Sequence, residues 1–344
     1  MKKPNSMSKL IPIAVLIGMI VVFTCSFLRG SFLVKLSEKE LNPKKQLEEA
    51  QASTYTLKEI DAKTGQIRWQ LNAKEGKTEN NLQTALIKDI DAEVYKNNKV
   101  IFKLTAPYAK ANAQTKEIYL FKGVTAKNKT GDFLLTSNQV SLGMGTSIEA
   151  QKGFNLVLKD TGNVSGENAL INDDQTDIQV INLKEAQFKD ITLSGKNVHL
   201  EKENNGDIQK ATITNGGNVI LKREKNSSLT ANTIKWEKSG KVEARGNVVY
   251  ISEDKIFKAD YLVLKPDGEI YAKDNVFISH GQTKCYGDIL NYENNSFITL
   301  NGNPKAIQGD KRISANKIVY DLNTSKVSAT GNVKTIVINK SEKT

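Results

Sequence analysis

The chain has 344 residues, of which 39% are hydrophobic and 25% are charged. This composition fits one large or two ordinary folded domains and excludes a chain kept disordered by its charge. The net charge of +11 favours an anionic partner such as a phosphorylated lipid, a membrane surface or nucleic acid. With only two cysteines and two histidines, each pair far apart, we expect no disulfide, no metal site and no cofactor.

An uncharged apolar run extends from Leu10 to Leu28, which is long enough to cross a bilayer as a helix. Lys2, Lys3 and Lys9 precede it, so the positive-inside rule places the N-terminus in the cytoplasm. A cleaved signal peptide is the alternative, but it needs a shorter apolar core and small residues at a cleavage site. The run is followed by Arg29 and has no such site, which favours an uncleaved anchor.

The sequence therefore predicts three N-terminal segments before any globular structure begins. They are a cytoplasmic tail over residues 1–9, one transmembrane helix over 10–34, and a polar, lysine- and glutamate-rich spacer over 35–54. The rest of the chain is then expected outside the cytoplasm.

Beyond residue 54 the apolar residues alternate with polar ones, which predicts β-strands with one dry face. Clear examples run from Ile67 to Ala73 and from Val100 to Ala106. No later stretch has a sustained helical period. We therefore predict an all-β structure after the anchor.

The C-terminal half repeats every 28 or 29 residues. Gly-Asn-Val begins at Gly217, Gly246 and Gly331, and related triplets begin at Asp274 and Gly302. A second motif shares the period and begins at Ala231, Ala259, Gly287 and Ala315. Aligned repeats superimpose Ile234, Leu262, Leu290 and Ile318 in one column, and Trp236, Leu264, Tyr292 and Tyr320 in the column two residues later.

Residues two apart share a strand face, so each repeat is predicted to be a pair of antiparallel strands joined by turns. Such a unit cannot bury its own apolar face and must stack on its neighbours. The glycines and asparagines are explained by turns that need positive φ angles. A looser rhythm in the N-terminal half extends the strand pattern over residues 55–339.

The stretch from Tyr55 to Gly76, followed by Val100 to Ala126, resembles the LptC family of lipopolysaccharide-export proteins. The matching features include Tyr55, an Ala-Pro turn at Ala106 and a Gly-Val hairpin at Gly123. The tandem repeats from about residue 191 are similar to the OstA/LptA type. We therefore predict an LptC-like β-jellyroll over 55–190 and OstA/LptA-like jellyroll repeats over 191–340.

The resemblance implies an elongated β-jellyroll of repeated antiparallel strand pairs, folded like a taco, whose apolar interior holds acyl chains. It implies an inner-membrane, single-pass protein with most of its chain in the periplasm. Its partners would be lipopolysaccharide, the permease subunits of an inner-membrane ABC transporter, and a periplasmic or outer-membrane jellyroll joined by end-to-end strand addition. The predicted groove residues are Trp69, Leu71, Phe102, Leu104, Phe121, Ile234, Trp236, Leu262, Leu264, Leu290, Tyr292, Ile318 and Tyr320.

Three other classes of function compete with lipid transport. The sequence has no nucleophile elbow, phosphate loop or zinc-protease motif, so we expect no enzyme and no catalytic residue. Nucleic-acid binding fits the charge but not the expected location outside the cytoplasm. A structural or adhesive surface solenoid without lipid remains the alternative, and it would need a closed core.

Overall fold

The computed structural model describes residues 51–52, 54–79, 84–112, 115, 117–143, 145–203, 206–222, 227–293 and 296–337. Over these residues the chain forms strands and turns without a helix, which confirms the all-β prediction. None of the described segments could cross a membrane as a helix. The predicted transmembrane segment, residues 10–34, lies outside the described part of the chain.

The described chain divides into two compact units. Unit 1 comprises residues 1–160 and 167–175, and unit 2 comprises 161–166 and 176–344. Strand β9 (Gly162–Ile171) therefore contributes its first half to unit 2 and its last half to unit 1. The family boundary predicted at residue 190 lies in a turn inside unit 2 and stays a prediction.

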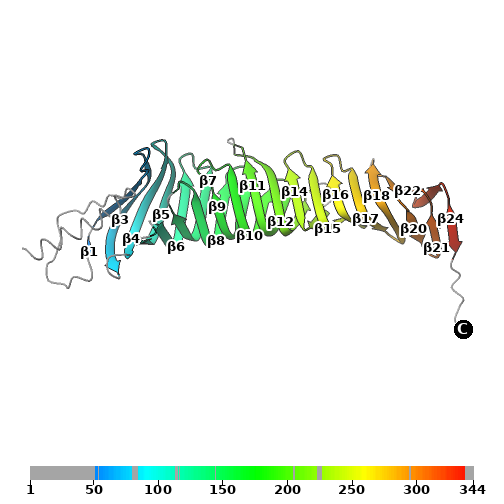
Figure 1. The fold of residues 1–344 in the computed structure, drawn as a ribbon, viewed down its shortest axis with the longest axis horizontal. Coiled ribbons are helices and arrows are strands. Elements are labelled where there is room, and N and C mark those ends of the chain that lie inside the picture. Colours follow the sequence, from blue (N-terminus) through cyan, green and yellow to red (C-terminus); the bar gives the residue numbers. More distant parts are fainter. Residues whose placement is uncertain are drawn as a thin grey trace, which may run out of the picture. The chain divides into compact units, whose positions relative to one another are not determined.

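Unit 1 is built from long antiparallel strands that pair in chain order from β2 to β8 (Figure 1). The short strand at its start, formed by the last residues of the predicted spacer, pairs with β3. Its strands are β1 (Gln51–Ala52), β2 (Tyr55–Ile60), β3 (Ile67–Glu79), β4 (Thr84–Lys96), β5 (Lys99–Asn112), β6 (Glu117–Asn128), β7 (Phe133–Leu142) and β8 (Ile148–Leu158).

Unit 2 continues the same antiparallel pattern with the 28-residue repeat. One repeat corresponds to two bent strands, some of which are interrupted at the bend and carry two labels. Its strands are β10 (Asp177–Phe188), β11 (Ile191–Lys202), β12 (Ile208–Leu221), β13 (Ser227–Ala231), β14 (Thr233–Glu237), β15 (Val242–Ser252), β16 (Lys255–Leu264), β17 (Ile270–His280), β18 (Thr283–Glu293), β19 (Phe297–Asn301), β20 (Lys305–Gln308), β21 (Lys311–Ser314), β22 (Lys317–Asp321), β23 (Lys326–Thr330) and β24 (Lys334–Val337).

Each long strand bends near its middle at a point that we call the corner. The strand register shifts there, as between Arg245 and Val248 in β15, and the corner residues have positive φ angles, 73° at Gly246 and 52° at Asn247. Pairing with the same neighbouring strand resumes after the shift. A corner is thus a β-bulge that turns the strand without ending it.

The corners correct part of the sequence interpretation. The Gly-Asn-Val motifs do supply positive-φ residues, but in the middle of strands and not in the loops that join them. Likewise the Ala-Pro turn at Ala106 and the Gly-Val hairpin at Gly123 are corners within β5 and β6. Bulges and hairpins use the same left-handed residues, so composition cannot separate them. The predicted turns at Ser239-Gly240 and Pro266-Asp267-Gly268 are confirmed as connections between strands.

The two repeat motifs meet at neighbouring corners. The backbone N–H of Asn232 donates to the carbonyl oxygen of Gly246, and that of Asn316 donates to Gly331. A Cβ atom added to Gly246 would lie 2.7 Å from the side-chain amide nitrogen of Asn232. Glycine is therefore required at this position by the approach of the neighbouring side chain as well as by the backbone angle.

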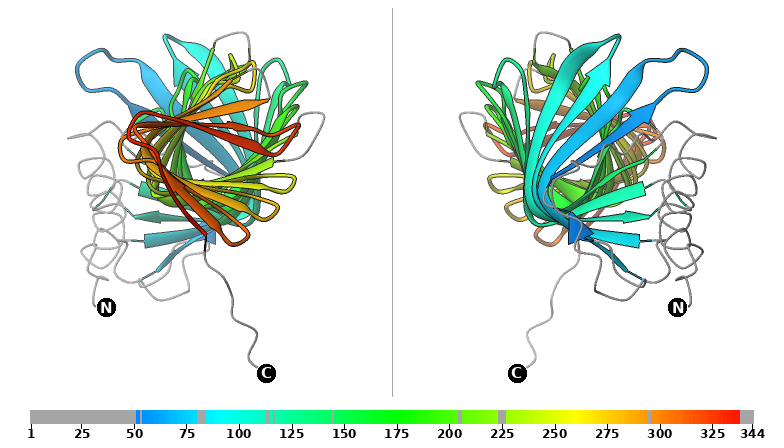
Figure 2. Two further views of the ribbon diagram at one scale, coloured as in Figure 1. Left: turned by 90° about the vertical axis from the view of Figure 1, so that its right-hand side faces the viewer. Right: turned by 90° about the vertical axis from the view of Figure 1, so that its left-hand side faces the viewer.

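Bending at the corners gives each unit two facing layers with the core between them (Figure 2). We name them layer A and layer B in each unit. In unit 1, layer A contains residues 67–73, 90–96, 99–105, 124–128, 133–137 and 154–158, and layer B contains 75–79, 84–88, 108–112, 117–121, 139–142 and 148–151. In unit 2, layer A contains 186–188, 191–195, 217–221, 227–231, 248–252, 255–259, 276–280, 283–287, 305–308, 311–314 and 334–337, and layer B contains 177–181, 197–202, 208–214, 233–237, 242–245, 261–264, 270–273, 289–293, 297–301, 317–321 and 326–330.

Candidate functional site

The apolar columns found in the sequence become continuous rows across layer B of unit 2. One row follows the strand register through Ile234, Ala244, Leu262, Ala272, Leu290, Leu300 and Ile318. The next row contains Trp236, Val242, Leu264, Ile270, Tyr292, Ile298 and Tyr320. Residues in the same register position on successive strands share one face of the sheet, so the repeat produces an unbroken apolar lining.

Unit 1 has a corresponding lining in layer A. The row through Leu71, Ala92, Leu104, Ala126, Leu135 and Leu156 follows the register of six strands. Trp69 and Phe102 occupy the adjacent row on either side of Val94. The Phe102 ring lies 5.3 Å from that of Phe133, measured between centroids.

Most of the predicted groove residues are buried in these interiors. The buried ones are Trp69, Leu71, Phe102, Leu104, Ile234, Leu262, Leu264, Leu290, Tyr292, Ile318 and Tyr320. Trp236 faces the same interior but is partly exposed. Both Trp69 and Phe102 have no exposed surface, so side chains already fill the space around them.

Phe121 was placed in the groove wrongly. In β6 the buried residues are Ile118 and Leu120, so Phe121 lies on the outer face. There its ring stacks on Tyr108 at 5.8 Å between centroids, and the amino group of Lys122 lies 4.4 Å above the Tyr108 ring. The corner at Gly123 interrupts the two-residue alternation, and counting across it puts Phe121 on the wrong side.

The sequence analysis of unit 2 also missed layer A, which forms the opposite wall of its interior. Its central row contains Val219, Leu229, Tyr250, Phe257, Ile278, Cys285 and Ala306. All of these are buried. The available signal was the residue two places after each Gly-Asn-Val valine, as at Tyr250 and Ile278, which repeats with the same period.

The two layers are joined by backbone at the corners and meet again through side chains at the opposite side. We call that side the free edge, because it is made of strand ends and connecting turns. In unit 1, Trp69 Nε1 donates to the carbonyl oxygen of Gly143 at 3.2 Å. The Lys96 amino group lies 2.6 Å from an Asp174 carboxylate oxygen and 3.2 Å from one of Asp173.

The free edge of unit 2 is bridged mainly by aromatic rings. Phe188 of layer A stacks on Trp236 of layer B, with centroids 6.4 Å apart and planes 13° from parallel. Phe257 of layer A lies 5.8 Å from Tyr292 of layer B. Burial raises the pKa of Tyr292, so its hydroxyl stays neutral at physiological pH.

His280 completes this set of contacts. Its Nδ1 lies 2.7 Å from the hydroxyl oxygen of Tyr320 in layer B, and its Nε2 lies 3.0 Å from a carboxylate oxygen of Asp254. Tyr320 is only 1% exposed, so this is a hydrogen bond at the boundary between core and solvent. His280 therefore ties an apolar wall to the opposite layer through a polar group.

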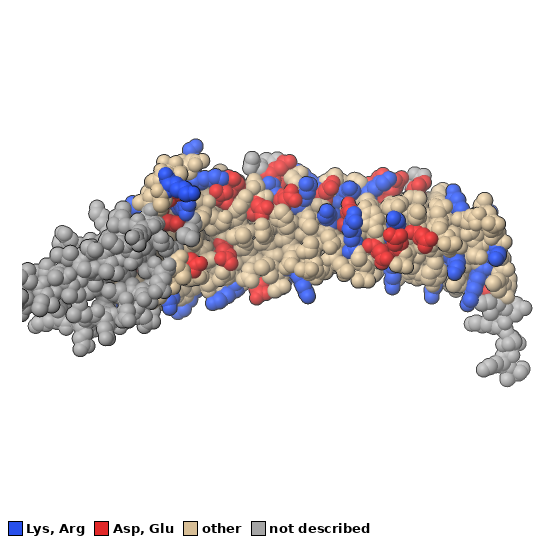
Figure 3. All heavy atoms as spheres, viewed as in Figure 1, with Lys and Arg blue, Asp and Glu red and all other residues tan. Residues whose placement is uncertain are grey.

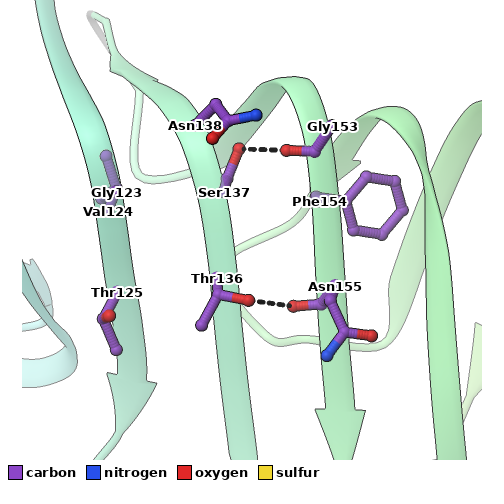
Figure 4. Close-up of a pocket in the computed structure, with 9 residues that line it drawn as sticks. All are labelled: Gly123, Val124, Thr125, Thr136, Ser137, Asn138, Gly153, Phe154 and Asn155. Atoms are coloured by element: carbon purple, nitrogen blue, oxygen red, sulfur yellow. Dashed lines mark hydrogen bonds between the residues drawn. The ribbon is translucent and has the colours of Figure 1, made fainter.

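A cavity of about 370 Å³ lies on the outer face of unit 1, beside the corners of β6, β7 and β8 (Figure 4). It is lined by Gly123, Val124, Thr125, Thr136, Ser137, Asn138, Gly153, Phe154 and Asn155. Thr136 and Asn155 alternate with the interior residues Leu135 and Leu156, which places this cavity on the opposite side of the sheet from the apolar rows. It is separate from the candidate lipid site.

Charged residues lie on the outer faces, where basic and acidic side chains are interspersed (Figure 3). Many are paired, as Arg245 is with Glu243 at 2.8 Å. Within the described ranges no cluster of three or more histidine, cysteine, aspartate or glutamate side chains could hold a metal ion. The distinctive chemistry of both units is the apolar interior.

Comparison with known proteins relates each part of the chain to lipopolysaccharide handling. Residues 13–148 match the family model described as lipopolysaccharide-assembly, LptC-related, and residues 201–326 match that of the LptA/(LptD N-terminal domain) LPS transport protein. No curated protein matches the chain. Among solved structures, it is similar to LptH of Pseudomonas aeruginosa, the LptA-homologous periplasmic component of the lipopolysaccharide transport device, at 19% identity over 34% of this chain and 98% of that one, with a TM-score of 0.32.

Proposed function

Because this chain joins an LptC-related region to a region of the LptA/LptD N-terminal type, we propose that it carries lipopolysaccharide between its two facing layers. The observation that supports this most is the unbroken apolar lining of each unit, which crosses successive strands in register. The role is transport without catalysis. It requires no cofactor, since burying an acyl chain is favourable by about 0.8 kcal/mol per methylene group.

We further propose that the apolar run from Leu10 to Leu28 anchors the chain in the inner membrane and that the two units lie in the periplasm. An anchored protein can take lipid from an ABC transporter in the same membrane without diffusing away. The length of the run and the three preceding lysines support this placement.

Strand addition is the proposed means of contact with a further jellyroll. The last described strand, β24, pairs with β21, and no other described strand pairs with it. Ile336 and Val337 in this strand are 61% and 53% exposed. An open strand edge with exposed apolar side chains favours pairing with a strand of another chain.

A structural or adhesive role is the second candidate, and one observation favours it. The interior is filled by its own side chains, as the complete burial of Trp69, Phe102 and Leu290 shows. A purely structural solenoid would be expected to have such a core. Lipid carriage instead requires the two layers to separate so that acyl chains replace contacts between side chains.

Site-specific photo-crosslinking in cells distinguishes the two candidates. A photoreactive phenylalanine analogue would replace Trp236, Leu264 or Phe102 on the interior, and Phe121 or Phe297 on the outer face as matched controls. We expect lipopolysaccharide adducts from the interior positions, strongest at the partly exposed Trp236, and none from the controls. If folded variants give no adduct from any interior position, the transport proposal is wrong and the structural role is favoured.

A further inference from the structure

The filled interior of unit 2 raises the question of where a lipid could enter. At the corners the layers are continuous backbone, and neighbouring corners are joined by backbone hydrogen bonds such as Asn232 N–H to Gly246 O. At the free edge the described contacts between layers are made largely by side chains. Side chains can change rotamer at much lower cost than a bulged ladder can be broken, so the free edge is the weaker side.

The contacts at that edge share a pattern. Each pairs an aromatic or imidazole ring of layer A with an aromatic ring of layer B, and the two partners come from strands that are not neighbours in the sheet. The pairs are Phe188 with Trp236, Phe257 with Tyr292, and His280 with Tyr320.

The layer B partners of these pairs all belong to one apolar row. Trp236, Tyr292 and Tyr320 stand in the same register position on successive repeats, where Leu264 and Ile298 are also found. The repeat therefore places a large ring at the mouth of the interior at three points. This row is the lining closest to the free edge.

We propose that these three ring pairs form a latch, which holds the free edge of unit 2 closed when no lipid is bound and opens sideways to admit acyl chains. The latch rests on the proposed lipid-carrying function and adds the route of entry to it. Acyl chains that slide between the layers would pack against the aromatic faces in place of the partner rings, so these faces stay covered by apolar groups when the edge opens.

The polar pair gives the latch a different character at one end. The hydrogen bond between His280 and Tyr320 has no acyl replacement, because a hydrocarbon cannot accept or donate it. Opening there must leave Tyr320 to find water or a polar group of the lipid. The pair therefore raises the cost of opening without a ligand that carries polar groups as well as chains, as lipopolysaccharide does.

A reversible cross-link tests the latch in the full chain held in lipid nanodiscs. Cys25→Ser and Cys285→Ala remove the native thiols, and Phe188→Cys with Trp236→Cys places one cysteine on each layer. A short bis-thiosulfonate reagent bridges the pair, and dithiothreitol releases it. The control pair is Lys235→Cys with Glu243→Cys, register partners on the outer face of layer B, where a bridge spans no edge.

Retention of fluorescent hexa-acylated lipopolysaccharide is then measured with and without the bridge. We expect bridging Phe188→Cys to Trp236→Cys to lower retention at least about tenfold, with recovery after reduction and no effect in the control. Equal retention with and without this bridge would overturn the latch while leaving lipid carriage intact. Failure of every variant to retain lipid, even unbridged and folded, would overturn the proposed function.

A second variant measures the polar pair without removing a ring. Tyr320→Phe deletes the hydrogen bond with His280 and keeps the aromatic contact. Since one net hydrogen bond is lost from the closed state alone, we expect lipid loading to become about fivefold faster. A merely structural hydrogen bond would lower thermal stability and leave the loading rate unchanged, which would exclude this pair from the latch.

Discussion

Replacing Gly302 by alanine tests the explanation of the corners. Gly302 has a φ angle of 75°, and an added Cβ would lie 2.5 Å from Cβ of Asp288 on the neighbouring corner. The left-handed conformation costs an alanine about 1–2 kcal/mol, and displacement of Asp288 adds to this. Because Asp288 is exposed and can move, we expect a total loss of about 1–3 kcal/mol.

The matched control is provided by the chain itself. Asp274 occupies the position equivalent to Gly302 one repeat earlier, with a φ angle of 62°. Asp274→Gly relieves the strained backbone but makes the unfolded chain more flexible, so we expect a change within about 0.5 kcal/mol. Its ion pair with Lys273, at 3.9 Å between exposed groups, contributes little.

Thermal unfolding followed by far-ultraviolet circular dichroism is a suitable assay. For a unit of this size, about 2–4 °C of melting temperature corresponds to each kcal/mol, so Gly302→Ala should lower the midpoint by about 3–10 °C. Asp274→Gly should leave it within about 2 °C. An unchanged midpoint for Gly302→Ala, or an equal loss in both variants, would refute the steric account of the corner.

Three further predictions concern burial and charge. Phe102→Ala should destabilise unit 1 by about 3–5 kcal/mol, whereas Phe121→Ala on the outer face should cost about 1 kcal/mol, and equal losses in urea denaturation would contradict their assigned faces. Burial raises the pKa of Cys285 to about 12, so the native chain should resist thiol-specific alkylation at about pH 8 until it is unfolded; rapid native labelling would show that this interior opens freely. Backbone N–H groups of Lys63 and Thr64, with the Arg68 guanidinium, lower the pKa of Asp61 from 3.8 to about 2, so its stabilising contribution is present above pH 3.8 and lost as the pH falls towards 2. Asp61→Asn should therefore weaken the pH dependence of the urea midpoint over that interval, and an unchanged slope would exclude Asp61 as a contributor.

Much of the candidate site could be predicted because a repeated strand carries its register in the sequence. Ile234, Leu262 and Leu290 were aligned by their 28-residue spacing, and the structure places them in one row. Burial of a whole face requires the same side-chain period on each strand, so this information is local. The family resemblances rest on the same motifs and are confirmed by the two family models.

The corners limited what the same pattern could say. A bulge adds a residue and inverts the alternation, so Phe121 was assigned to the wrong face although Leu120 beside it is buried. The positive-φ residues predicted a change of chain direction correctly, but a hairpin and a bulge satisfy that requirement equally. The strand lengths, and thus the existence of two layers, depended on this distinction.

The sequence by itself determined that the chain after the spacer is a stack of antiparallel strands with a regular apolar face, because strand alternation and repeat spacing are properties of neighbouring residues. Only the tertiary structure decided which layer faces which, and how the free edge is closed. Phe188 and Trp236 meet through strands that are not neighbours, and their contact depends on the bend of every strand between them. No local pattern encodes such a contact, because it arises from the accumulated geometry of the whole unit.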